Sequence, residues 1–113
     1  MVTAETAVVL PVMVLVLAGA VAAVVVVGAQ LRCVDAAREA ARAAARGEDS
    51  STVTGLARAA GPDGAVVRIS ESDGEVRVEV SADVSPLGAV PLTATVEATA
   101  VAWVEPGSPG VGG

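Results

Sequence analysis

Histidine, lysine, tyrosine and phenylalanine are absent from this 113-residue sequence, which contains one cysteine and one tryptophan. Enzymes that move protons or form covalent intermediates usually need a histidine or a nucleophile held beside a base. Neither arrangement is visible, so we expect no enzyme, no catalytic residue, no metal site and no cofactor. The single cysteine, Cys33, cannot form a disulfide within the chain. We predict that it is a small buried residue on a helix.

Charge is distributed unevenly along the chain. All basic residues are arginines, and the formal net charge is −6. Residues 32–46 carry a net charge of +2, whereas residues 47–113 carry −7. Affinity for nucleic-acid phosphates comes largely from clustered Lys and Arg. We therefore expect no direct nucleic-acid binding.

A long apolar run near the N-terminus is the most informative feature present. Residues 6–31 carry no formal charge, and residues 7–29 consist of Ala, Val, Leu, Gly, Met and one Pro. As a helix, residues 7–29 would measure roughly 35 Å, against roughly 30 Å of bilayer hydrocarbon. No polar face is available for water, so lipid or neighbouring helices must surround this segment.

The helix is predicted to continue beyond the apolar run. Good helix formers without Gly or Pro extend to Arg46, and Gly47 follows as a C-cap. From about Thr3 to Arg46 the rod would be roughly 65 Å long. Its last turns carry charged residues at helical spacing, which we interpret as a solvated face with local ion pairs between Asp35, Arg38, Glu39, Arg42 and Arg46.

Residues 47–104 predict a small head domain. A short helix from Thr52 to Ala60 should end at Gly61 and a turn. The periodicity then changes to two, which predicts an antiparallel sheet with one exposed face. The expected strands lie at 67–70, 75–84 and 93–102, with a hairpin turn at 72–74.

Three strands with an Ala and Val inner face bury little apolar area and need a cover. The short helix and the C-terminal half of the long helix are the candidates. The predicted fold class is therefore α+β: one long helix (1–46), a small αβ head (47–104) and a flexible Pro/Gly tail (105–113). We expect Trp103 either to cover a sheet edge or to contact a neighbour.

Three segments resemble a known family. The N-terminal Thr3-Ala4-Glu5-Thr6-Ala7-Val8-Val9-Leu10-Pro11, the Ala-rich residues 36–42 and the closing strand at 98–102 are similar to TadE-like pseudopilins of tight-adherence (Tad, Flp-type) pili, within the wider type IV pilin-like class. The resemblance covers nearly the whole chain. It implies a structural subunit that is held in the cytoplasmic membrane by one helix and then packed into an extracellular filament.

The resemblance also implies processing and partners. A prepilin peptidase would cut immediately before Met1, which makes Glu5 the fifth residue of the mature chain; alternatively, Met1 is the initiator. The implied partners are copies of the chain, other pilins, the prepilin peptidase and the assembly machinery.

Glu5 is the main candidate assembly residue. A carboxylate in the first helical turn is favoured by the helix dipole by roughly 0.3–1 kcal/mol, which alone could explain it. Inside a helix bundle, however, an unpaired carboxylate would cost several kcal/mol. We expect the amine of Met1 on an adjacent subunit to pair with it. Pro11, which frees the carbonyl of Ala7, is expected to kink the helix.

Two alternatives concern the membrane segment. A small-residue site at 20–22 would suit signal-peptide cleavage, but no basic segment precedes it. The four arginines after the apolar run would by themselves favour a cytoplasmic C-terminal side, whereas a removed basic leader could override them. The orientation of the helix in the membrane is therefore left open. The main rival function is a single-pass anchor that presents a small partner-binding β domain without polymerising.

Overall fold

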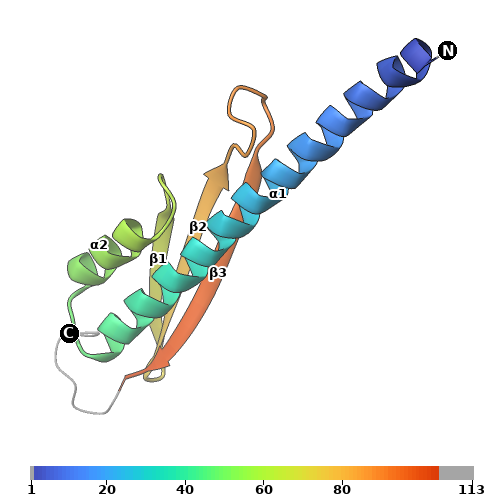
Figure 1. Cartoon of the computed structure of the whole chain (residues 1–113). Coiled ribbons are helices and arrows are strands. Elements are labelled where there is room, and N and C mark those ends of the chain that lie inside the picture. The colour runs from blue at the N-terminus through green and yellow to red at the C-terminus, as the bar shows by residue number, and fades with distance from the viewer. Residues whose placement is uncertain (1, 105–113) are drawn as a thin grey trace.

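Two helices precede three strands in the computed structural model, which describes residues 2–104 (Figure 1). The α+β class and the predicted order of elements are confirmed. The predicted tail at 105–113 lies outside the described residues. The elements are α1 (Val2–Ala45), α2 (Ser50–Ala60), β1 (Val66–Ser72), β2 (Glu75–Val84) and β3 (Ala94–Trp103).

Helix α1 is one continuous helix and ends where its sequence predicts. Gly47 has a φ of 88°, a left-handed conformation that glycine adopts without strain. The amide of Gly47 donates to the carbonyl of Ala44 at 3.0 Å, and the amide of Glu48 donates to that of Ala43 at 3.2 Å. These two bonds form a Schellman motif, which satisfies carbonyls at the helix end.

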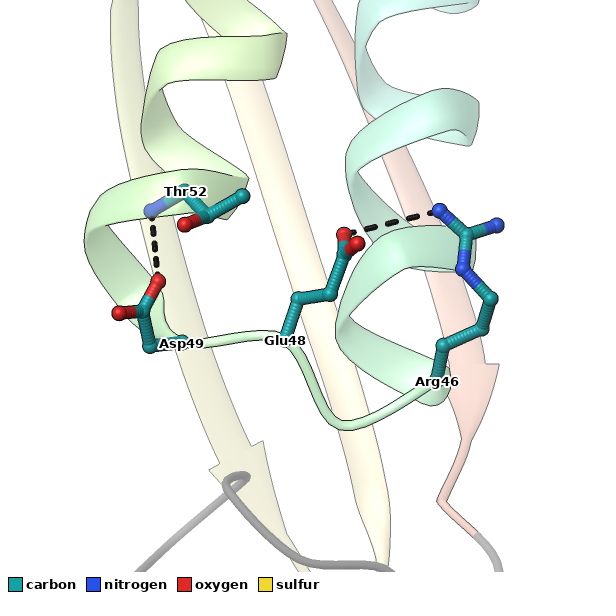
Figure 2. A network of polar contacts seen from close by, with 4 residues as sticks. All are labelled: Arg46, Glu48, Asp49 and Thr52. Carbon is teal, nitrogen blue, oxygen red and sulfur yellow. Dashed lines mark hydrogen bonds and ion pairs between the residues drawn. The ribbon is translucent and has the colours of Figure 1, made fainter.

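Helix α2 begins two residues earlier than the sequence pattern indicated. Asp49 is its N-cap, and the backbone N–H of Thr52 donates to the Asp49 carboxylate at 3.0 Å (Figure 2). The Thr52 side chain, and then this backbone bond, hold the pKa of Asp49 below its ordinary value. The connection between the helices therefore needs only the residues from Arg46 to Asp49.

The sheet is antiparallel with β2 in the centre. Asp73 and Gly74 join β1 to β2, with φ of 51° and 80°. Two positive φ values match a type I′ turn, whose twist suits a two-residue hairpin. The turn pairs Ser72 with Glu75 and fixes the register of the whole hairpin.

One face of the sheet is covered by both helices, as predicted. Helix α1 packs along β2 and β3 and against α2, which in turn contacts β1 (Figure 1). Eight of the fifteen core residues come from α1, and they are seven alanines and Cys33. Small side chains let α1 lie close to the valines of β2. The core is therefore a thin seam between one helix and one sheet.

The charged residues of α1 lie on its exposed side, as expected for a solvated face. The predicted ion pairs among them are absent from the described part of the chain. Within residues 2–104, ion pairs join Arg46 to Glu48 at 3.6 Å and Arg77 to Glu75 at 3.5 Å (Figure 2 shows the first). Exposed charges gain little from pairing, so side chains such as Arg42 remain solvated instead.

Candidate assembly helix

The N-terminal half of α1 projects away from the head (Figure 1). The first buried core residue along the helix is Ala29, and of the residues before it only Val26 is a partly buried hydrophobic packed against the core within residues 2–104. Large apolar side chains cover this half on all sides. The exposed ones are Val2, Val8, Val9, Leu10, Val12, Met13, Val14, Leu15, Val16, Leu17, Val21, Val24, Val25 and Val27.

Exposing this apolar surface to water is unfavourable in free energy. At about 1.5 kcal/mol or more for each buried Val, Leu or Met, covering these side chains would be worth on the order of 20 kcal/mol. In residues 2–104, α1 is the one helix that is long and apolar enough to cross a membrane. The projecting half thus requires lipid, or other helices, around it.

Glu5 lies in the first turn of α1 and is exposed. The hydroxyl of the next residue, Thr6, donates to the carbonyl of Val2 at 2.9 Å and orders this turn. No ion pair involves Glu5 within the described residues. Met1, the other predicted assembly residue, lies outside them, as does the predicted cleavage point immediately before it. Any partner of Glu5 therefore remains a prediction.

Pro11 lies inside α1, and helical structure continues on both sides of it. Its ring removes one backbone donor, which leaves the carbonyl of Ala7 without its intrahelical partner. Ala7 and Pro11 are both exposed residues. The predicted kink stays a prediction.

Cys33 is fully buried between α1 and the sheet. Burial raises the pKa of its thiol, because the thiolate would lose hydration. A buried thiol with a raised pKa is a packing group and not a nucleophile. Within residues 2–104, no three Cys, Asp or Glu side chains gather into a possible metal site.

One functional contact was missed by sequence reasoning. The side-chain amide of Gln30 donates to the carbonyl of Glu97 at 2.7 Å, and the amide of Glu97 donates back to the Gln30 side-chain oxygen at 3.2 Å. This pair attaches the head to α1 at the point where the apolar run ends. The only signal in the sequence was Gln30 itself, a single amide side chain between the apolar run and Arg32.

Trp103 does not cover a sheet edge. It is 71% exposed at the last position of β3, on the outward face of the sheet, and Val101 on the same face is also exposed. The alternative, contact with a neighbouring subunit, stays a prediction.

Comparisons with known proteins identify a family match over most of helix α1. A family model described as TadE-like protein matches residues 1–42, which include the whole projecting half of α1. The chain is also 42% identical over 104 residues to a Mycobacterium tuberculosis (strain ATCC 25618 / H37Rv) protein named apoptosis inhibitor Rv3655c, covering 92% of this chain and 79% of that relative. No solved structure matches the chain significantly.

Proposed function

Because this chain belongs to the TadE-like family, we propose that it is a structural, pilin-like subunit of a Tad pilus. Helix α1 holds the subunit in the cytoplasmic membrane as a single span before assembly. The same helix then packs against other pilin helices in a cell-surface filament. The subunit performs no chemical reaction, and its role is assembly.

The observation that carries this proposal is the projecting half of α1, apolar on all sides and outside the core. A lipid bilayer and a bundle of similar helices are both apolar surroundings. A helix of this kind can therefore move from one to the other at a small cost in free energy. An ordinary soluble domain would not need it.

Glu5 is accommodated differently in the membrane and in the filament. In the membrane, Glu5 at the end of the helix can remain at the water boundary. In a filament the helix ends are surrounded by neighbours, and a buried carboxylate is tolerated only when it is paired. The amine of Met1 on the next subunit is the proposed partner, which also sets the register between helices. This pairing requires a free amine at Met1, which cleavage immediately before Met1 by a prepilin peptidase would supply.

The test is to replace Glu5 and measure two locations separately. Glu5→Gln should insert in the membrane normally, since removing a charge makes insertion easier, but should be depleted in sheared surface filaments. Glu39→Gln is the matched control, because Glu39 is an exposed acid on the part of α1 that packs on the head. It should enter filaments like the unaltered chain.

Normal incorporation of Glu5→Gln would contradict the pairing and favour a single-pass anchor that presents a binding domain. Mass spectrometry of the native N-terminus is the second measurement. A chain that begins at Met1 after removal of a leader supports the proposal. A chain that retains residues ahead of Met1 contradicts it, because no amine would then lie beside Glu5.

A further inference from the structure

The loop at 85–93, between β2 and β3, is unlike the other connections in the chain. No formal charge occurs between Asp83 and Glu97, whereas the helix connection, the turn after α2 and the β1–β2 turn all contain an acid. Its side chains Val90 and Leu92 are 46% and 54% exposed. An apolar loop with exposed side chains suits a surrounding less polar than water.

Backbone hydrogen bonds hold this loop in shape. The amide of Gly88 donates to Ser85 at 3.2 Å, the amide of Val90 to Leu87 at 3.3 Å, and the amide of Leu92 to the carbonyl of Val90 at 2.7 Å. The loop therefore satisfies part of its own backbone. That is a requirement for any segment that enters an apolar medium.

The loop lies beside the end of the projecting half of α1 that is nearest to the head. A hollow of about 430 Å³ is lined by Val24, Val25 and Gly28 of α1 together with Val84 at the end of β2 and Ser85 at the start of the loop. The charged residues Arg32, Asp63 and Asp83 also line this hollow, so its inner side is polar. Figure 1 shows the loop extending beyond the sheet along α1, toward its N-terminus.

The position of the end of the loop along α1 can also be derived from the contact between Gln30 and Glu97. Glu97 is level with Gln30, and Ala94 lies three residues earlier in β3, or about 10 Å at 3.3 Å per residue. Along a helix, about 10 Å corresponds to about seven residues. Ala94 is thus level with about Ala23, and the loop ends there.

The same level is the expected membrane boundary. With Glu5 at one boundary, about 20 residues of helix cross the roughly 30 Å of hydrocarbon and place the other boundary near Val25. Arg32 lies about 10 Å further out, at the level of the lipid headgroups. The head cannot therefore stand clear of the bilayer, and its uncharged loop is the part that meets it.

We propose that the loop at 85–93 inserts Val90 and Leu92 into the interface of the lipid bilayer, at the boundary between headgroups and acyl chains. The loop and α1 then form two points of attachment, which fix the tilt and height of the head before assembly. Entry into a filament must withdraw the loop from lipid. This inference rests on the membrane anchoring in the proposed function, but not on filament formation.

Lipid-borne quenchers test the insertion in the full chain. In a Cys33→Ala background, Val90→Cys carries an environment-sensitive fluorophore, and the protein is placed in phosphatidylcholine vesicles that contain nitroxide-labelled lipid. The same fluorophore at Leu15→Cys, within the apolar run, is the positive control. At Ser72→Cys, an exposed position beside the β1–β2 turn at the opposite end of the sheet, it is the negative control.

The expected result is that lipid nitroxides quench the labels at 90 and 15 and leave the label at 72 unquenched. Quenching at 15 without quenching at 90 would overturn the loop insertion alone. Absence of quenching at both positions would overturn the membrane anchoring as well. If position 90 escapes lipid quenching and the unlabelled Val90→Cys variant forms disulfide-linked dimers, the loop contacts a second copy and the proposal is wrong.

Discussion

The side chain of Gln30 pairs with the backbone of Glu97 as a neighbouring β-strand would, donating to its carbonyl and accepting from its amide. Both backbone groups of Glu97 therefore point away from β2, so Ser81 and Glu97 form a non-hydrogen-bonded pair in the ladder. An edge strand with free backbone groups invites pairing with other chains. Gln30 protects this part of the β3 edge and attaches it to α1.

Replacing Gln30 should loosen the head from the helix. Gln30→Ala removes both bonds, and at about 0.5–1.5 kcal/mol each we expect a loss of about 1–3 kcal/mol in the free energy of unfolding. Thermal unfolding of the full chain in detergent measures this loss. Thr95→Val is a control of the same kind, since it removes the single exposed bond from Thr95 to Asp83 at the start of β3. A loss no greater than the control's would show that the pair contributes little.

Gln30→Glu should make the stability of the head depend on pH. An ionised carboxylate can accept from the amide of Glu97 but cannot donate to its carbonyl, so folding favours the protonated form and raises the pKa of the new side chain. The stability of this variant relative to Gln30 should therefore improve as pH falls and decline as pH rises through the raised pKa. Unfolding curves at several pH values check the sign. Equal stability across that range would contradict the geometry.

The seam between α1 and the sheet should be intolerant of larger side chains. Ala40 is fully buried at this seam. Ala40→Leu would push the helix from the strands, and overpacking of this kind typically costs about 1–3 kcal/mol. Ala59→Leu is the matched control, because Ala59 is exposed on α2 and its replacement should change stability by about 0.5 kcal/mol or less. Equal melting temperatures for the two variants would contradict close packing at the seam.

Local sequence features account for most of the fold. The ends of α1, the cap at Asp49 and the Asp73-Gly74 turn depend on residues within a few positions of one another, and the sequence predicted two of these three correctly. The alternation of β2 predicted its buried face because one side of the sheet is covered. Such features follow from residue types and spacing alone.

What the sequence could not predict lies between distant residues. Gln30 and Glu97 are 67 positions apart, and no periodicity connects them. The loop at 85–93 has no repeating pattern, so its position beside Val24 follows only from the placement of β2 and β3 on α1. The absent ion pairs of Arg38 and Arg42 were wrongly expected, because spacing permits a pair without making it favourable in water. Pairing of Glu5 depends on other subunits.

The thiol of Cys33 should be protected in the native chain. Its burial raises its pKa, so the folded state keeps the proton at pH values where the unfolded thiol ionises. This group therefore leaves stability unaffected below the ordinary thiol pKa and lowers it as pH rises above that value. Maleimide should label native protein slowly and denatured protein rapidly at neutral pH. Cys33→Ser should still assemble, and loss of pili in that variant would assign the thiol more than packing.

The cap of α2 should weaken in acid. The pKa of Asp49 is lowered by Thr52, so its contribution to stability is present above the ordinary pKa of aspartate and is lost as pH falls through the lowered value. Asp49→Asn keeps an oxygen acceptor for the Thr52 amide but cannot titrate. The variant should therefore unfold with a smaller dependence on pH in the acid range, measured by circular dichroism. An unchanged acid profile would exclude Asp49 as its source.

The head should depend on α1 for its stability. Eight of the fifteen core residues belong to α1, and removing them would expose the inner face of the sheet. A chain that begins near Gln30 keeps the packed part of the helix without the membrane run, so it should be soluble and unfold cooperatively. A chain that begins at Gly47 keeps all three strands and α2 but should be unstable. Urea denaturation followed by circular dichroism compares them. Cooperative unfolding of the shorter chain at similar stability would show that α2 alone covers the sheet, and that α1 is an anchor attached to an independent domain.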